Sequence, residues 1–450
     1  MRSLLIGLAL TSGCGPAADT GGDALLLAVL PYTGKWEDKG LLHENAVRMA
    51  MEDLIASGLQ EAYGGSFKVV TVNSGDGIDV VEAAVRDVVA GPNGDKILGI
   101  LSSTGDAHEG AARVAVELGV PHYEVSNGAA DEEFLDPADW PDTLGYLLSA
   151  RALCNYEAVY TAQFIASNFP GASVALIRGN EVHDKMHTAV IRTELAALGF
   201  TGTVIESQDP ALVGEVDPGN RQDFEVSYDD LNYGGIEVPL TDLVTTHAPD
   251  VLFFHVRGDG PNLRFLQDTE RAGFTGEIVT CGMARTSTLI DPNENGLLSD
   301  YLVGHDTPQD VDRFHFVMRG AIPSARLDTF KAEYKERFEM DADTFTPAAY
   351  DATVMWALGV LAASEPEREL VLQSIVDASR EGELGSRDDL SALIERVAGG
   401  FDLDYDGVSG PMDVRDDRSV PGYYFIERVI PGEAGAYGYE KLGDPEPVVF

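Results

Sequence analysis

Hydroxyl-bearing residues follow two apolar segments in the N-terminal third of the chain. Residues 97–101 lead into Ser103 and Thr104, and residues 122–125 lead into Ser126. Where an apolar strand ends and the next helix begins, hydroxyls and backbone N–H groups can converge on a carboxylate beside the positive helix terminus. The same residue types also cap helices and build plain turns. The pattern therefore indicates a carboxylate-binding site or, alternatively, local capping.

Two further side chains could contribute to such a site from the middle of the chain. His183 follows the apolar run of residues 173–178, and Arg257 follows the run of residues 251–256. A histidine near its ordinary pKa can donate a hydrogen bond and add pH sensitivity, although a solvent-facing loop histidine explains the residue equally well. Arginine can grip a carboxylate with two parallel hydrogen bonds, or it can pair with one of the many surface acids.

Signatures of catalysis and of metal binding are missing from the sequence. It contains no nucleophile elbow, no HExxH zinc motif, no phosphate-binding glycine loop and no dinucleotide fingerprint. Asp402, Asp404 and Asp406 begin like a calcium loop, but two flanking helices are not evident. Cys154 and Cys281 either pair or remain buried thiols, and no metal spacing involves them. We therefore predict no enzyme activity, no cofactor and no bound metal.

Strand-then-helix units position the candidate residues. Residues 24–30 form an apolar run without alternation, which is typical of a strand covered on both faces, and Tyr32 lies in the turn that follows. Similar units recur along residues 67–125, and a second series runs along residues 155–280. Alternating strands and helices with short loops favour a doubly wound α/β sheet. Such sheets bind ligands at the carboxyl ends of their strands, which is the expected place of Tyr32.

The composition limits the size and the partners of the protein. At 450 residues the chain is longer than one compact core and should divide into two or three domains. Lys and Arg number 31 against 75 Asp and Glu, which gives a net charge of −44. A field of this sign repels phosphate backbones and anionic lipid headgroups, so it argues against nucleic acid as a partner.

The first 23 residues have the layout of an export segment. Arg2 precedes a short apolar run, and small residues then lead to Cys14, so residues 1–14 resemble a lipoprotein signal in which the cysteine becomes the lipidated first residue. An ordinarily cleaved or uncleaved signal is the alternative. Residues 15–23 are expected to form a flexible tether. We expect an exported protein, periplasmic or at the cell surface, held at the membrane by lipid on Cys14.

Six short segments, taken in order, carry a family resemblance. They are residues 29–34 (VLPYTG), 99–104 (GILSST), 126–130 (SNGAA), 248–251 (APDV), 350–352 (YDA) and 405–411 (YDGVSGP). Together they resemble the extracytoplasmic solute-binding proteins of the branched-chain amino acid type. The resemblance implies the type I periplasmic-binding fold, in which two doubly wound lobes are joined by three crossovers. It places lobe one at residues 24–147 and 281–364, and lobe two at residues 148–280 and 365–450.

The resemblance also implies a ligand site between the lobes. The residues expected to face the ligand are Tyr32, Ser103, Thr104, Ser126, Ala129, Ala130, His183 and Arg257. Amino-acid binders of this family commonly carry an acid after the strand that ends near Thr280, where the acid pairs with the ligand's ammonium group, but this chain has Ala284 there. Either another acid, Asp106 or Glu181, takes that role, or the ligand is not an α-amino acid.

The function that the resemblance implies is conformational. The protein is expected to capture a small polar, carboxylate-bearing solute, an amino acid or a related acid, between its lobes and to deliver it to the membrane subunits of an ABC permease. The bound solute would stabilise the closed state. One alternative is a sensory protein on the same fold that signals to a membrane partner. A third possibility is a hydrolase-like enzyme.

Overall fold

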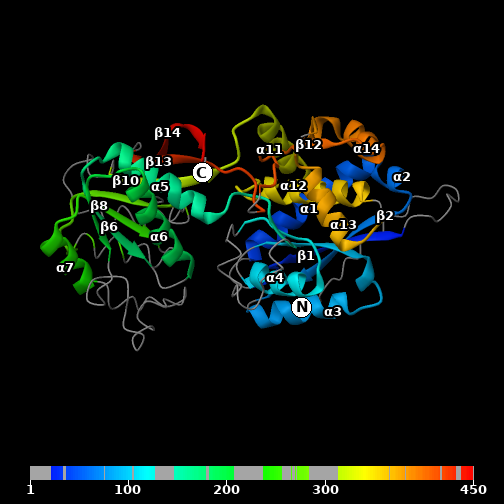
Figure 1. Ribbon diagram of the computed structural model, residues 1–450, viewed down its shortest axis with the longest axis horizontal. Coiled ribbons are helices and arrows are strands. Elements are labelled where there is room, and N and C mark those ends of the chain that lie inside the picture. The colour runs from blue at the N-terminus through cyan, green and yellow to red at the C-terminus, as the bar shows by residue number, and fades with distance from the viewer. Residues whose placement is uncertain are drawn as a thin grey trace.

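The structure, a computed structural model, consists of two lobes that lie side by side (Figure 1). It describes residues 22–33, 37–75, 77–103, 106–126, 146–178, 182–206, 237–255, 271–282, 313–363, 365–380, 382–415, 418–431 and 437–448, together with Phe265 and Thr269. Within this part of the chain, no helix is both long enough and apolar enough to span a membrane. The predicted signal and most of the predicted tether lie outside the described residues.

Lobe one is built on a five-stranded parallel sheet of order β2-β1-β3-β4-β5. The strands are β1 (Asp23–Leu30), β2 (Ser66–Asn73), β3 (Ile97–Ser102), β4 (His122–Glu124) and β5 (Leu147–Ser149). All residues of β1 from Ala24 to Leu30 are buried. The prediction of a strand covered on both faces is therefore confirmed.

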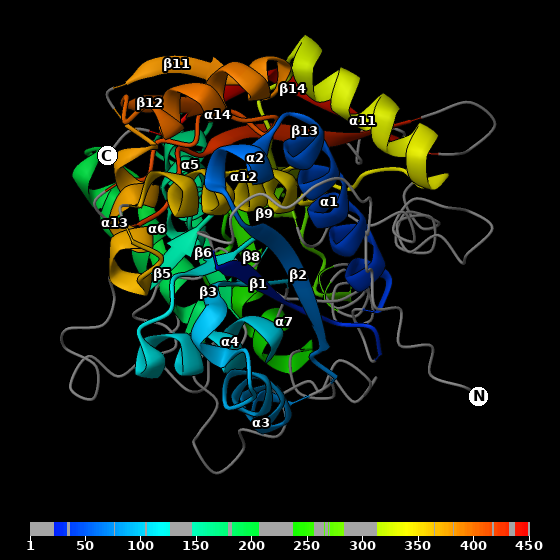
Figure 2. The same ribbon diagram turned by 90° about the vertical axis from the view of Figure 1, so that its right-hand side faces the viewer.

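Two cores cover the two faces of this sheet, because successive side chains of a strand point to opposite faces. Leu26 and Ala28 of β1 pack into the larger core, whereas Leu25 and Leu27 pack into the smaller one. Figure 2 shows α3 and α4 on one side of the sheet and α1, α2 and α12 on the other. The helices of the lobe are α1 (Glu37–Ala56), α2 (Leu59–Tyr63), α3 (Ile78–Val89), α4 (Asp106–Leu118), α11 (Ala325–Phe338), α12 (Thr346–Ala362), α13 (Arg368–Asp377) and α14 (Leu390–Ala398).

Helix α12 lies at the centre of the larger core. Its residues from Thr346 to Val360 are all buried. Trp356 packs against β3 at Gly99, where an added Cβ would lie 2.4 Å from Cδ1 of the indole. α13 approaches the other side of the helix so closely that a Cβ at Gly359 would lie 2.3 Å from Cγ1 of Ile375. Contacts on all sides explain why the sequence of α12 is apolar on most faces.

Lobe two is built on a seven-stranded sheet of order β14-β13-β10-β9-β8-β6-β7. The strands from β10 to β7 run parallel, and β13 and β14 run antiparallel at one edge. The strands are β6 (Ser173–Arg178), β7 (Thr203–Glu206), β8 (Val251–His255), β9 (Glu277–Cys281), β10 (Phe314–Gly320), β13 (Tyr423–Pro431) and β14 (Tyr437–Pro447), and the helices with bounds are α5 (Cys154–Asn168), α6 (Val182–Ala197) and α7 (Glu237–His247).

The chain passes between the lobes three times. Two of these passages lie at other positions in the sequence than expected. β10 was expected in lobe one and lies in the sheet of lobe two, because it pairs with both β9 and β13. Residues 368–406 were expected in lobe two and belong to lobe one, because Val371 and Ile375 of α13 and Leu393 of α14 pack into the core around α12. A small parallel pair, β11 (Glu383–Ser386) and β12 (Leu403–Asp406), completes lobe one.

Candidate functional site

Ser103 and Ser126 lie next to each other at the carboxyl ends of β3 and β4. Ser126 Oγ donates a hydrogen bond to the backbone oxygen of Ser103 at 2.7 Å. Ser103 Oγ lies 2.7 Å from Nδ1 of His43 on α1. Both serines are buried. Their hydroxyls therefore tie the two strand ends to each other and to α1, and neither hydroxyl is turned to solvent.

His43 connects the end of β3 to the start of α12. Its Nε2 lies 3.9 Å from Oδ1 of Asp343, and Oδ2 of Asp343 accepts a hydrogen bond from Lys39 Nζ at 3.0 Å. The same carboxylate caps α12, because its Oδ1 accepts from the backbone N–H of Thr346 at 2.8 Å. Burial of the carboxyl opposes ionisation, yet His43, Lys39 and Thr346 together lower the pKa of Asp343 well below its ordinary value.

Ser103, His43 and Asp343 are the residue types of a hydrolytic triad, but the arrangement lacks two of its requirements. The nucleophile of a triad must be reached by a substrate, whereas Ser103 is fully buried. The 3.9 Å between the histidine and the carboxylate also exceeds hydrogen-bond length. As it stands, this series is a structural link between α1, β3 and α12.

A second serine–histidine contact lies on the other face of the sheet. Ser102 Oγ lies 2.8 Å from Nε2 of His122 on β4 and 3.5 Å from Nδ1 of His108 on α4. The two imidazole rings stack with their centroids 5.2 Å apart. Burial lowers the pKa of both histidines, and the opposing attraction of Glu124 on His108 does not outweigh it. Both rings are therefore neutral at pH 7.

Tyr32 directly follows β1 at the same edge of the sheet. Its backbone N–H donates to Oδ1 of Asn73 at 3.0 Å, which joins the ends of β1 and β2. The ring packs against the larger core of lobe one, and burial raises the pKa of its hydroxyl above the ordinary value. Tyr32 is thus anchored at the strand edge where the sequence predicted a ligand-facing residue.

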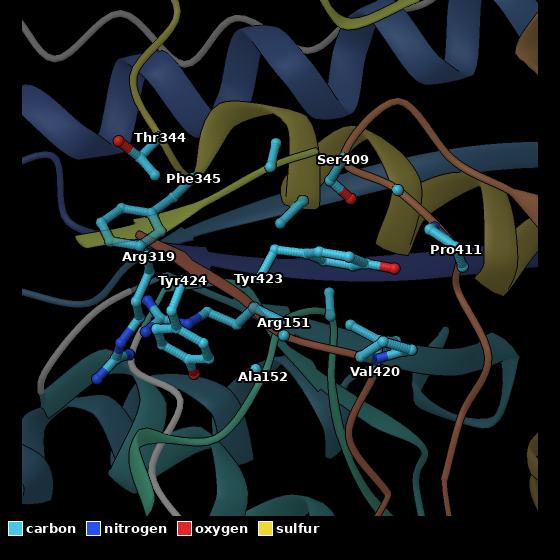
Figure 3. A pocket seen from close by; sticks show the side chains of 16 residues that line it. Arg151, Ala152, Arg319, Thr344, Phe345, Ser409, Pro411, Val420, Tyr423 and Tyr424 are labelled. Carbon is cyan, nitrogen blue, oxygen red and sulfur yellow. The ribbon is translucent and has the colours of Figure 1, made fainter. Parts of the chain in front are cut away.

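A cavity of about 60 Å³ lies where the three passages between the lobes meet (Figure 3). Its lining comes from residues 150–152, 319–321 and 420–424, with additional residues from the start of α12 and from residues 409–411. Each of the three passages therefore contributes a wall. A cavity built in this way must change shape when the lobes move relative to each other.

Two arginines supply the charge of this hinge cavity. Arg151 donates from Nη1 to the backbone oxygen of Ser126, and its guanidinium carbon lies 4.7 Å from the ring centroid of Phe345. Arg319 forms an ion pair with Glu157 of α5. Figure 3 shows Arg151 and Arg319 on the same side of the cavity, beside Phe345 and Tyr424. Arg151 connects the hinge to the carboxyl end of β4, and hence to the predicted ligand site.

The two C-terminal family-like segments meet at a buried aspartate. Asp351 of α12 accepts hydrogen bonds from Tyr405 Oη at 3.0 Å, from Val408 N at 2.9 Å, and from Ser409 N and Oγ at 2.8 and 2.5 Å. Gly407 allows this approach, because a Cβ there would lie 2.5 Å from the Asp351 carboxyl carbon. Burial raises the pKa of Asp351 to about 6 despite these four donors. The segment is therefore held to α12.

The calcium-like sequence and the cysteines also have defined surroundings. Asp406 forms an ion pair with Arg326 at 2.7 Å. Among the described residues, no group of three or more His, Cys, Asp and Glu side chains could hold a metal ion. Cys281 ends β9 as a buried thiol, whereas the side chain of Cys154 lies outside the described part of the chain.

The other predicted site residues can be placed only in part. Cys14, Thr104, Ala129, Ala130 and Arg257 lie outside the described residues. The backbone of His183 belongs to the first turn of α6, but its side chain is not among those described. The structure brings Ser103 and Ser126 together and places Tyr32 at the same edge, although none of these three lines the hinge cavity. Their contact with a ligand remains a prediction.

Sequence reasoning did not find Arg151, His43 or Asp343. Arg151 lies two residues after the end of β5, and this position after a strand is the signal that could have identified it. His43 precedes Glu44, but the sequence has no second histidine at the spacing of a zinc motif. Its partners Ser103 and Asp343 lie 60 and 300 positions further along the chain, so no local sequence pattern indicates these contacts.

Solved structures with similar folds decide the architecture. A leucine-binding protein from Thermotoga maritima matches with a TM-score of 0.58 at 14% identity, over 93% of this chain and 97% of its own. A solute-binding protein of an ABC transporter from Rhodopseudomonas palustris, in complex with 3,4-dihydroxybenzoic acid, matches with a TM-score of 0.60 at 14% identity, over 95% and 98%. This chain has the type I periplasmic-binding fold. An ABC transporter substrate-binding protein from Sphaerobacter thermophilus reaches a TM-score of 0.64 at 12% identity, over 95% and 98%.

The type I periplasmic-binding fold confirms the architecture expected from the sequence. Two doubly wound lobes are joined by three passages, and the similarity extends over nearly the whole chain. At identities of 12–14%, the similarity establishes the fold alone. No protein-family model and no curated protein matches the sequence.

Proposed function

We propose that the protein is an exported substrate-binding protein that captures a small carboxylate-bearing solute between its lobes and delivers it to an ABC permease. The observation that carries this proposal is the hinge cavity, to which all three passages contribute. Because no other described segment joins the lobes, bending at these passages would change the separation of the two sheets. Capture by closure needs this freedom and needs no covalent chemistry.

The carboxylate preference is supported by the edge of lobe one. α4 begins at Asp106, shortly after β3, so its N-terminal N–H groups lie at the carboxyl edge of the sheet. We propose that Ser103, Thr104, Ser126, Ala129 and Ala130 form this side of the site. The leucine-binding protein and the 3,4-dihydroxybenzoic acid complex named above bind ligands that share a carboxyl group.

The solute need not be an α-amino acid. β9 ends at Cys281, and the segment after it contains Ala284 where amino-acid binders carry an acid for the ammonium group. An ammonium group buried without a counter-charge is costly, whereas a simple carboxylic acid has no such requirement. On lobe two, we propose that His183 and Arg257 face the solute.

Export and anchoring complete the proposal. Residues 1–14 would direct the chain out of the cytoplasm, lipid on Cys14 would hold it at the membrane, and residues 15–23 would act as a tether. A protein held in this way stays within reach of a permease in the same membrane. Mass spectrometry of the exported protein would detect a lipidated Cys14 as the first residue.

A panel of paired carboxylates and amides tests the proposed solute class. Thermal unfolding of the purified chain would be measured with leucine and leucinamide, benzoate and benzamide, and 3,4-dihydroxybenzoate and its amide. A ligand that binds only the folded, closed state must raise the melting temperature. We expect a rise with at least one carboxylate and none with its amide. A flat response throughout, or equal responses to acid and amide, would contradict the proposal.

A further inference from the structure

We propose that the hinge cavity is itself a binding site for a small monovalent anion, held by the guanidinium of Arg151. The volume of about 60 Å³ limits the occupant. A cavity that holds benzene measures about 150 Å³, so this smaller volume matches chloride or a formate-sized carboxylate. This site is separate from the proposed solute site at the ends of β3 and β4.

The charge of the lining favours an anion. Among the described residues that line the cavity, the charged ones are Arg151 and Arg319, and none is acidic. This is unexpected in a chain with 75 acidic and 31 basic residues. Glu157 neutralises Arg319 from outside the cavity wall. Among the described lining residues, the charge of Arg151 is therefore the one without a carboxylate partner, which matches an anion of charge −1.

Arg151 has more hydrogen-bond donors than its contact with Ser126 uses. A guanidinium carries five N–H groups, and within the described part of the chain Arg151 makes one hydrogen bond, to the backbone oxygen of Ser126. Its other contact is the face of Phe345, which carries no formal charge. Both partners of this half-buried guanidinium are neutral. A charged acceptor therefore stabilises it more than it would stabilise a guanidinium that already pairs with a carboxylate.

Two of the hydroxyls that line the cavity are already engaged. Ser409 Oγ donates to Asp351, and Tyr424 Oη donates to the backbone oxygen of Leu153 at 3.2 Å. The Ser409 end of the cavity is also close to the Asp351 carboxyl group, which repels an anion once it is ionised. The anion is therefore expected at the opposite end, beside Arg151 and Arg319, where Figure 3 shows both side chains.

Anion exchange at constant ionic strength tests the site. The melting temperature of the purified full chain would be recorded in sodium gluconate, which is replaced stepwise by sodium formate or by sodium chloride, with no solute present. We expect a saturable rise with formate, with chloride or with both. A rise with formate alone identifies a carboxylate site, and a rise with chloride alone identifies a halide site. The absence of a saturable rise with either anion would overturn the proposal.

Three variants assign the effect to the cavity. Arg151→Gln should weaken the apparent affinity for the anion about tenfold or more, because it removes the charge. Arg151→Lys keeps the charge but loses the fork, so an intermediate affinity is expected. Glu157→Gln leaves Arg319 without its carboxylate and should strengthen binding. Arg428→Gln is the matched control, since Arg428 pairs with Glu440 on β13 and β14.

The variants also keep the proposal falsifiable if one of them does not fold. If Arg151→Gln is unstable, Arg151→Lys and Glu157→Gln must still shift the affinity in opposite directions. Unchanged anion affinity in both, or the same loss in Arg428→Gln, would overturn the proposal. Because no solute takes part, a negative result here leaves the proposed transport function untouched.

Discussion

Two buried serine–histidine contacts, made by the last residue of β3 and by the residue that follows it, differ in what lies beyond the histidine. Ser102 contacts His122 on the face covered by α4, and Ser103 contacts His43 on the face covered by α1. His43 has the carboxylate of Asp343 beyond it, whereas His122 has a second neutral imidazole, His108. Both faces therefore hold an acid, but Asp343 lies next to the histidine that contacts Ser103, whereas Glu124 acts on His108.

The two contacts therefore support the structure in different ways. On the α1 face, Asp343 joins Lys39, His43 and the start of α12, so this contact fixes the strand end that leads to the predicted ligand site. On the α4 face, burial holds the histidines neutral, so that contact is stable only while they remain unprotonated. The following changes should separate the two.

Removing the Asp343 carboxylate should have the largest effect on the free energy of unfolding. Asp343→Ala is expected to lower the free energy of unfolding by about 2–4 kcal/mol, because it removes a helix cap and leaves Lys39 without its partly buried partner. Urea denaturation measures this change. Asp341→Ala is the matched control, since Asp341 forms an exposed pair with Lys335, and its effect should stay within about 0.5 kcal/mol. Equal effects of both variants would contradict the role given to Asp343.

Lowering the pH should destabilise the protein through the histidines on the α4 face. The pKa of His122 is lowered in the folded protein, so protonation favours unfolding, and its contribution to stability is intact above pH 6.5 and lost as the pH falls below that value. Relative to His122→Asn, the wild type should lose up to about 1.4 kcal/mol per pH unit below pH 6.5. The difference between the two proteins must be used, because Asp351, with its pKa raised to about 6, titrates with the opposite sign. A difference that is independent of pH would argue against a buried neutral histidine.

Removing one hydroxyl at a time should give the smallest changes and the sharpest contrast. Ser102→Ala and Ser103→Ala each leave a buried imidazole nitrogen without its partner, at a cost of about 1–2 kcal/mol. Only Ser103→Ala should also weaken binding of the carboxylate found in the solute panel, because the Ser103 contact with His43 fixes the strand end on the proposed binding side. Calorimetric titration of both variants measures the affinities. Equal affinities would remove Ser103 from the proposed site.

Much of the fold could be predicted because its signals are local. The apolar run of residues 24–30 predicted a strand covered on both faces, and β1 is that strand. β14 was not predicted, because its sequence, YGYEKLGDPEP, is rich in residues that usually avoid strands. As the edge strand of the lobe-two sheet it pairs only with β13, and an edge strand tolerates such residues.

The lobe boundaries and the hinge cavity could not be predicted, because they depend on contacts between distant segments. β10 pairs with β13, more than one hundred positions along the chain, and this pairing assigns β10 to lobe two. Arg151 and Arg319 meet at the cavity from different passages. No window of sequence contains both members of either pair, so periodicity and motif spacing carry no information about them.

Small-angle X-ray scattering with and without solute tests the central claim most directly. The radius of gyration of the purified chain would be measured alone, with a saturating concentration of the carboxylate that raises the melting temperature most, and with its amide. Capture between two lobes predicts a smaller radius with the carboxylate and an unchanged radius with the amide. An unchanged radius at saturation, with binding established by calorimetry, would contradict capture by lobe closure.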